Sequence, residues 1–262
     1  PNQTYESIQG ALKVYYNLEK ILTEITGMDK TSLQPSAGSQ GEMVGLLLMK
    51  KYHQKHKIKN KKYIIIPETA HGTNPASVIM SGYQVKQVKS NNRGRVDLNH
   101  LKELVNSEVA GMMLTQPNTL GLFENEIEEI CKIIHNVDGL MYMDGANLNA
   151  LVGIAKPGNF GPDVCHINLH KTFCIPHGGG GPGMGPIACK KHLEIYLPKH
   201  PVVEDCGPTT GIGAVSAAPW GSSSILSISW MYIKMMGSEG LKLASQVAIL
   251  NANYIAHRLK DH

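Results

Sequence analysis

The spacing of apolar residues divides the chain into helical and extended segments. Over residues 4–26, apolar side chains recur three or four positions apart, which predicts an amphipathic helix within an N-terminal helical segment, residues 1–30. Gly27 follows this pattern and is a natural C-terminal stop, because glycine readily adopts the left-handed conformation that ends many helices. A second helical pattern runs from residue 40 to about residue 56.

Short apolar stretches alternate with helical ones through the middle of the chain. The helical stretches include residues 97–106, with Asp97 as the predicted N-cap, and residues 124–137. The C-terminal segment, residues 225–262, is helical again, with a break predicted at Gly237 and Gly240. The predicted strands are residues 63–66, 85–88, 111–114, 140–143, 164–168 and 187–189. Such alternation predicts an α/β fold with a mostly parallel sheet and helices on both faces.

Length and composition favour one large domain over residues 1–262, since apolar residues make up 42% of the chain and can bury a substantial core. The net charge of +4 is modest. Lysines gather in residues 50–62, where a solvated helix end and turn is a better interpretation than a nucleic-acid patch. Nucleic acid is therefore not an expected partner. A membrane is not expected either, because no apolar run is long enough to span a bilayer.

The five cysteines are odd in number and lack CxxC spacing, which indicates reduced thiols in a soluble intracellular protein. Pro1 leads almost directly into a helical pattern, and the chain stops at His262 just after another. This arrangement suggests a piece of a longer polypeptide.

Polar residues follow several predicted strands, where ligands bind in parallel α/β sheets. Asp144 closes the strand 140–143, and Lys171 lies in the loop after the strand 164–168. Pyridoxal phosphate needs both residue types. A lysine amine forms its Schiff base, and a carboxylate keeps the pyridine nitrogen protonated as an electron sink for carbanion chemistry.

A phosphate group needs backbone N–H groups at the start of a helix. The small residues Ser36, Ala37 and Gly38 open the second predicted helix and fit this need without a cation. The ring of a cofactor also needs an aromatic face over it, and His71 stands at a strand end where it can supply one.

Other chemistries fit the sequence less well. Cys165, His166 and His170 suggest zinc, but a strand places Cys165 and His166 on opposite faces, so no metal is expected. The glycine run 178–185 lacks the GK[ST] ending of a nucleotide phosphate loop. Cys174 is interpreted as a small buried filler rather than a redox-active thiol.

Five segments together resemble one family. Residues 168–186, NLHKTFCIPHGGGGPGMGP, are similar to the lysine segment of the glycine cleavage system P-protein. Residues 33–38, 70–77, 142–150 and 216–222 resemble the same family, and the similarity runs over nearly the whole chain. The resemblance implies the large domain of a fold-type I pyridoxal-phosphate-dependent transferase.

On the catalytic side, the resemblance implies that Lys171 holds pyridoxal 5'-phosphate covalently, with His170 beside it. Asp144 would contact the pyridine nitrogen, His71 would stack on the ring, and Asn118 would lie near the phenolic oxygen.

On the phosphate side, the resemblance implies contacts from Ser36, Ala37 and Gly38, and Ala146 joins the cofactor-binding set. His177 and the glycines after it would shape the entrance for the lipoyl arm of a partner.

The implied activity is that of an oxidoreductase in glycine catabolism. Glycine is decarboxylated, CO2 is released, and the aminomethyl group passes to the lipoyl arm of H-protein. The resemblance covers the central part of the family's C-terminal half, so a homodimer or pairing with the related N-terminal half is expected. The location would be the mitochondrial matrix in a eukaryote or the cytoplasm in a bacterium.

Two alternatives stay open. The first alternative to the implied activity is another fold-type I decarboxylase or desulfurase. The second is a non-catalytic fragment or partner subunit of the glycine enzyme. The absence of the related N-terminal half and of a small C-terminal domain favours the second alternative, while Asp144 and Lys171 argue that the site is intact.

Overall fold

The computed structural model describes residues 3–177 and 181–260, and its centre is a seven-stranded sheet with the order β1-β7-β6-β5-β4-β2-β3. The strands are β1 Lys30–Ser32, β2 Tyr63–Pro67, β3 Gln84–Val88, β4 Val109–Thr115, β5 Leu140–Gly145, β6 Val164–Ile167 and β7 Ile187–Cys189. Strands β3, β2, β4, β5 and β6 are parallel, whereas β7 runs antiparallel to both β6 and β1. The mostly parallel sheet predicted from the sequence is therefore confirmed.

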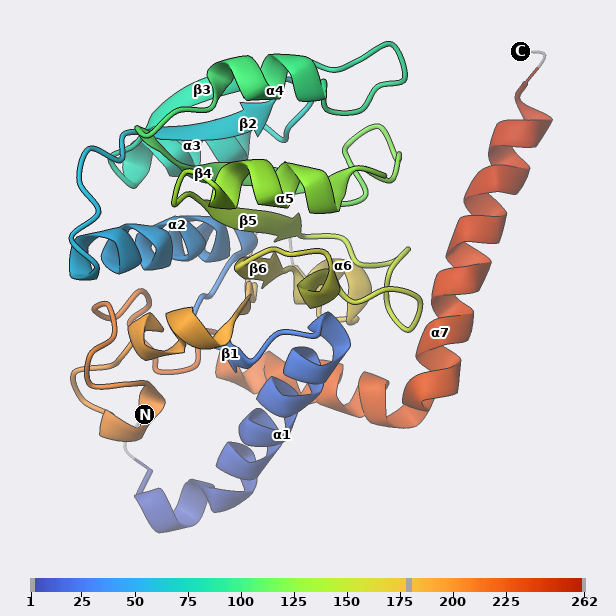
Figure 1. Ribbon diagram of the computed structural model, residues 1–262. Helices are drawn as coiled ribbons and strands as arrows, with labels where there is room; N and C mark the ends of the chain where they lie inside the picture. Colours follow the sequence, from blue (N-terminus) through green and yellow to red (C-terminus); the bar gives the residue numbers. More distant parts are fainter. Residues whose placement is uncertain (1–2, 178–180, 261–262) are drawn as a thin grey trace.

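Helices cover both faces of this sheet (Figure 1). The α-helices are α1 Gln9–Thr26, α2 Gly38–Lys55, α3 Thr73–Met80, α4 Leu98–Leu104, α5 Ile127–His135, α6 Leu169–Thr172 and α7 Leu226–Arg258. Short 3-10 turns are η1 Tyr5–Ile8, η2 Pro157–Asn159, η3 Lys191–Tyr196, η4 Glu204–Cys206 and η5 Ser223–Ile225. Among these helices none is both long and apolar enough to cross a membrane.

Three apolar clusters hold the layers together. One joins α2 and α3 to one face of the sheet, and another joins α4 and α5 to the opposite face. The third packs α1 and the first half of α7 against the β5, β6 and β7 end of the sheet. Leu46 and Leu48 on α2 are fully buried, and burial of such a side chain contributes roughly 1.5–3 kcal/mol.

Helix α2 lies close to the sheet because glycines face it. A Cβ atom at Gly45 would lie 2.6 Å from the Tyr142 ring, and one at Gly41 would lie 3.2 Å from Cβ of His166. At Gly38 it would overlap the Asn168 side chain. These glycines let α2 approach β5 and β6 at the edge where the strands end.

The sequence located most elements to within a few residues. Gly27 ends α1 in the left-handed conformation, and Asp97 caps α4 by accepting hydrogen bonds from the N–H groups of Asn99 and His100. Apart from the 3-10 turns, three elements were not predicted, namely β1, α3 and the four-residue helix α6, where a loop was expected. Helix α2 begins at Gly38, two residues before the predicted start.

Helix α7 is broken at Gly237, as predicted, where φ is 63° and ψ is −177°. Gly240 is helical, so the predicted break belongs to Gly237 alone. Beyond the kink the helix stands away from the sheet (Figure 1), and many of its apolar side chains are exposed.

Candidate functional site

A cavity of about 960 Å³ lies where the parallel strands β4, β5 and β6 end. Its walls also include the start of α2, the segment after β2, and one stretch of α7 beyond the kink. The volume is in the range of small-molecule and cofactor sites. The predicted site residues that line it are Ala37, Gly38, His71, Asn118, Asp144, Ala146, His170 and Lys171.

Ser36 is the predicted residue that the structure does not place in the lining. Its backbone N–H donates to Oε1 of Gln40, and its hydroxyl lies 3.1 Å from the same oxygen. The first turn of α2 reaches the cavity instead through Ala37, Gly38 and Ser39. Their place at a helix start suits an anion.

Asp144 is the second-last residue of strand β5 and a buried carboxylate of the cavity, with 3% of its surface exposed. The N–H of Ala146 donates to its Oδ1 at 2.9 Å, and the amide of Asn74 donates to its Oδ2 at 3.2 Å. Because both oxygens accept a hydrogen bond, the carboxylate is held in one orientation at the cavity wall.

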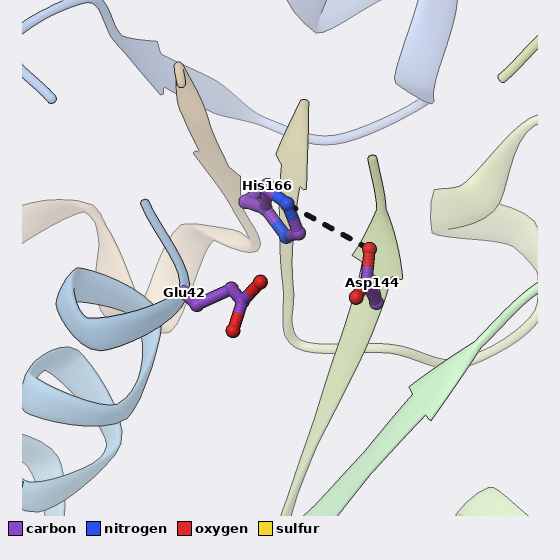
Figure 2. A group of neighbouring side chains, drawn as sticks. All are labelled: Glu42, Asp144 and His166. Carbon is purple, nitrogen blue, oxygen red and sulfur yellow. Dashed lines mark ion pairs between the residues drawn. The ribbon is translucent and has the colours of Figure 1, made fainter. Parts of the chain in front are cut away.

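Two further titratable side chains lie beside Asp144, and Figure 2 shows them converging from α2, β5 and β6. Atoms of Glu42, Asp144 and His166 that can bind a proton or a cation all lie within 4.8 Å of one another. His166 Nε2 is 3.6 Å from Asp144 Oδ1, and its Nδ1 is hydrogen-bonded to the hydroxyl of Tyr142. Sequence reasoning missed Glu42, because a glutamate inside a helix reads as a solvated residue.

Burial raises the pKa of the Tyr142 hydroxyl well above its usual range, and the nearby carboxylates of Asp144 and Glu42 raise it further. Tyr142 therefore stays protonated. The glycines of α2 described above provide the room for both rings.

Lys171 lies on the short helix α6, one residue after His170, and its side chain is exposed. The His170 ring stacks on that of His177, with centroids 4.0 Å apart and an angle of 12° between the planes. Burial lowers the pKa of His170, and the adjacent His177 and Lys171 lower it further. His170 therefore favours its neutral form. Of the predicted entrance, Gly178–Gly180 lie outside the described residues.

His71 is exposed at the rim of the cavity, and its Nδ1 lies 2.7 Å from Oγ1 of Thr73. This contact fixes one ring nitrogen and leaves a ring face for stacking. The predicted stacking role needs an exposed face, which this placement provides.

Asn118 reaches the cavity with its polar atoms already in use. Its amide nitrogen donates to the Gly94 carbonyl and the Glu124 carboxylate, and its oxygen accepts from the N–H groups of Leu120 and Leu122. This residue therefore organises its own loop, and a contact to a cofactor oxygen would require one of these bonds to open.

The structure also tests two predictions about cysteines, one for Cys165 beside His166 and one for Cys174. Cys165 packs in the cluster beneath α1 and α7, whereas His166 faces α2, as strand alternation predicts. The prediction that Cys174 is buried is wrong. Cys174 is exposed and has a φ of 65°, because the chain turns sharply after α6.

The lysine-rich stretch is the end of α2 and the turn after it, as preferred from the sequence. Lys50 and Lys61 donate to backbone carbonyls, of Ser81 and Val109 respectively, and Lys62 pairs with Glu108.

Comparisons with known proteins agree on one family. The family model described as glycine cleavage system P-protein matches residues 1–203. Glycine dehydrogenase (decarboxylating) of Pelagibacter ubique is 64% identical over 264 residues, covering 100% of this chain and 28% of that protein. The mitochondrial protein of the same name from Mus musculus is 53% identical over 263 residues, covering 98% of this chain and 26% of that protein. The chain thus spans little more than a quarter of these relatives.

One relative is a separate subunit. Probable glycine dehydrogenase (decarboxylating) subunit 2 of Caldanaerobacter subterraneus is 51% identical over 269 residues, covering 100% of this chain and 55% of that protein.

The solved structures show the fold. A crystal structure of glycine decarboxylase (P-protein) of the glycine cleavage system matches with a TM-score of 0.72 at 19% identity, covering 90% of this chain and 55% of that one. The fold-type I large domain expected from the sequence is confirmed.

Proposed function

Because the chain belongs to the glycine cleavage system P-protein family, we propose that it carries the pyridoxal 5'-phosphate site of a glycine-decarboxylating enzyme. The reaction consumes glycine and a lipoylated H-protein. Glycine loses its carboxylate as CO2, the aminomethyl carbon bonds to one lipoyl sulfur, and the other sulfur becomes a thiol. The lipoyl disulfide is thereby reduced, and no cysteine of this chain is needed.

The observation that carries the proposal is that Asp144 and Lys171 line one cavity. They come from β5 and from the segment that follows its parallel neighbour β6, so the sheet itself brings them together. A buried carboxylate and a nearby primary amine are the pair that this cofactor requires.

The remaining polar groups of the cavity also fit the cofactor. Four residues of its lining each carry a buried polar atom without a hydrogen-bond partner among the described residues: Thr115, Asn168, His170 and His177. Such atoms are costly unless a ligand or water satisfies them. The start of α2 adds backbone N–H groups for a phosphate.

Each residue then has a defined task. Asp144 binds the ring nitrogen and keeps a proton on it, and Lys171 supplies the amine that holds the cofactor. Ala37 and Gly38 bind the phosphate, and His71 covers the ring. When bound, the cofactor would supply an electron sink for the decarboxylation.

His170 is the second proposed catalytic residue. Its ring is stacked on His177 next to Lys171, and its lowered pKa keeps a neutral imidazole available as a proton acceptor.

The partners follow from the family. We propose that the chain pairs with the related N-terminal half or with a second copy, and the existence of a relative described as subunit 2 supports separate halves. The proposed location is the mitochondrial matrix or the bacterial cytoplasm, since relatives come from both kinds of source.

A second candidate is a non-catalytic part that needs other segments to complete the site. The exposed side chain of Lys171 favours it, since a lysine that forms a Schiff base works best when shielded from water.

The test is a visible absorption spectrum of the purified protein with pyridoxal phosphate, followed by glycine-dependent CO2 release with lipoylated H-protein. Lys171→Ala is the test variant, and Lys20→Ala, at an exposed position on α1, is the matched control. A stable band that only Lys171→Ala abolishes, together with CO2 release, supports the enzyme. A band without CO2 release, or a band that appears only when the related N-terminal half is added, supports the second candidate. No band in the folded protein with or without that half contradicts both.

A further inference from the structure

Asn74 joins two buried carboxylates. It lies on α3 with 1% of its surface exposed, and its amide nitrogen is 3.1 Å from Glu42 Oε2 and 3.2 Å from Asp144 Oδ2. An amide nitrogen has two hydrogens, so each carboxylate receives one. The bridge therefore fixes the distance and orientation between Glu42 and Asp144.

Glu42 is itself fully organised by α3. It is 5% exposed, Thr73 Oγ1 donates to its Oε1 at 2.8 Å, and Ser77 Oγ donates to its Oε2 at 3.2 Å. Thr73 also contacts the ring of His71. Glu42 thus connects the two side chains proposed to hold opposite parts of the cofactor ring, Asp144 at its nitrogen and His71 on its face.

The buried carboxylates of Glu42 and Asp144 lie within 4.8 Å of one another. Their negative charges repel, and burial removes the water that would screen this repulsion. Polar donors lower this cost but bring no net positive charge. His166 is the third member of the group, and its Nε2 has no hydrogen-bond partner among the described residues. The surplus of negative charge suits a ligand that brings a positive charge to Asp144.

We propose that Glu42 is a positioning residue for the cofactor's ring nitrogen: it orients Asp144 through Asn74 and adds its own negative charge to that of Asp144. This inference rests on the proposed function. The carboxylate pair, rather than Asp144 alone, then holds the ring nitrogen in its protonated form.

The other titratable groups around this point come from both sides of the cavity. His166 and Tyr142 lie on the sheet, and His71, His170 and Lys171 lie in the cavity lining or at its rim. A change in charge at Glu42 also acts on the hydroxyl of Tyr142, whose pKa the Glu42 carboxylate helps to raise, so the test includes a variant that keeps this charge.

The experiment uses pyridoxal phosphate labelled with ¹⁵N in the ring, bound to the purified protein, and follows the ¹⁵N chemical shift against pH. Glu42→Gln keeps the size of the side chain and removes its charge. Glu42 lies within 4.8 Å of the Asp144 carboxylate that would hold the ring nitrogen. An opposite charge within about 4–6 Å changes proton affinity by about tenfold or more, so in Glu42→Gln the ring nitrogen should lose its proton about one pH unit lower or more. Ser77→Ala, which removes one donor to Glu42 and keeps the charge, should titrate like the wild type.

An unchanged titration in a folded Glu42→Gln protein overturns the inference. If Glu42→Gln does not fold, as judged by circular dichroism, the inference is tested with Asn74→Ser instead. This variant breaks the bridge, so it should release the cofactor on dialysis at least several-fold faster than Ser77→Ala does. Equal release would overturn the inference.

The proposed function fails in a different way. If the wild-type protein binds no pyridoxal phosphate, the assignment of the site is wrong whatever the variants do. If the wild type binds and Glu42→Gln is indistinguishable from it, only the role of Glu42 is wrong.

Discussion

Replacing Gly45 by alanine tests how closely α2 packs on the sheet beneath the site. The new Cβ would lie 2.6 Å and 2.7 Å from two ring carbons of Tyr142, and that ring is fully buried with its hydroxyl bonded to His166. Neither the ring nor the helix backbone can move without disturbing its neighbours. Overpacking of this kind costs roughly 1–3 kcal/mol.

The helix propensity of alanine offsets part of this cost, since alanine is favoured over glycine by up to about 1 kcal/mol within a helix. Gly10→Ala provides the control, because Gly10 is also helical and a Cβ there would have no atom within 4 Å. We expect Gly10→Ala to be neutral or slightly stabilising. Gly45→Ala should be less stable than Gly10→Ala by about 1–3 kcal/mol.

The assay is urea denaturation of both variants and the wild type, followed by far-UV circular dichroism. If Gly45→Ala has the same unfolding midpoint and slope as Gly10→Ala, the close approach of α2 to β5 is wrong. The geometry of the Glu42 and His166 group would then need revision as well, because α2 carries Glu42.

Three further predictions concern other parts of the molecule. Asp97→Ala should lower the free energy of unfolding by about 1 kcal/mol, because α4 loses its N-cap, and an unchanged urea midpoint would contradict this. The hydrogen bond to Asp163 raises the pKa of His135, although partial burial opposes it. The stabilisation by this pair is therefore complete below the ordinary histidine pKa of 6.5 and is lost as the pH rises through the raised pKa. In urea titrations, His135→Gln should lower the free energy of unfolding more at pH 5.5 than at pH 9. Equal effects at the two pH values would refute this prediction. Cys174 should react with a thiol reagent before Cys165, because Cys174 is exposed whereas Cys165 is fully buried and its pKa is strongly raised by burial; mass spectrometry of partially labelled protein would show the order, and earlier labelling of Cys165 would contradict it.

The sequence predicted the sheet well because its strands are short apolar runs between polar turns. Strand β5 is fully buried along its length, and such a run is distinctive. Strand β1 is different. It has three residues, begins with the exposed Lys30, and exists because it pairs with β7, more than 150 residues later. Local periodicity carries no information on such a pairing.

Helix α3 was missed because its first turn looks like a loop. Gly72 precedes it and Pro75 lies in its first turn, where proline is tolerated since no intrahelical N–H bond is required there. This short helix nevertheless carries Thr73, Asn74 and Ser77, the donors that surround Glu42.

The site residues that could be predicted from the sequence are those at or just after the ends of predicted strands. Asp144 and Lys171 stand at the ends of consecutive parallel strands, so strand order alone brings them to one edge. Glu42 and Asn74 were not predictable, because their closeness depends on how α2 and α3 pack. The glycines at 41 and 45, four positions apart on α2, were the signal in the sequence that this helix lies unusually close to the sheet.

The most direct test of the central claim is to locate the cofactor chemically. The protein is incubated with pyridoxal phosphate, reduced with borohydride, digested, and analysed by mass spectrometry. We expect one reduced cofactor on the peptide that contains Lys171, and a much lower yield for Asp144→Ala. A folded protein that is modified at other lysines, or at none, would contradict it.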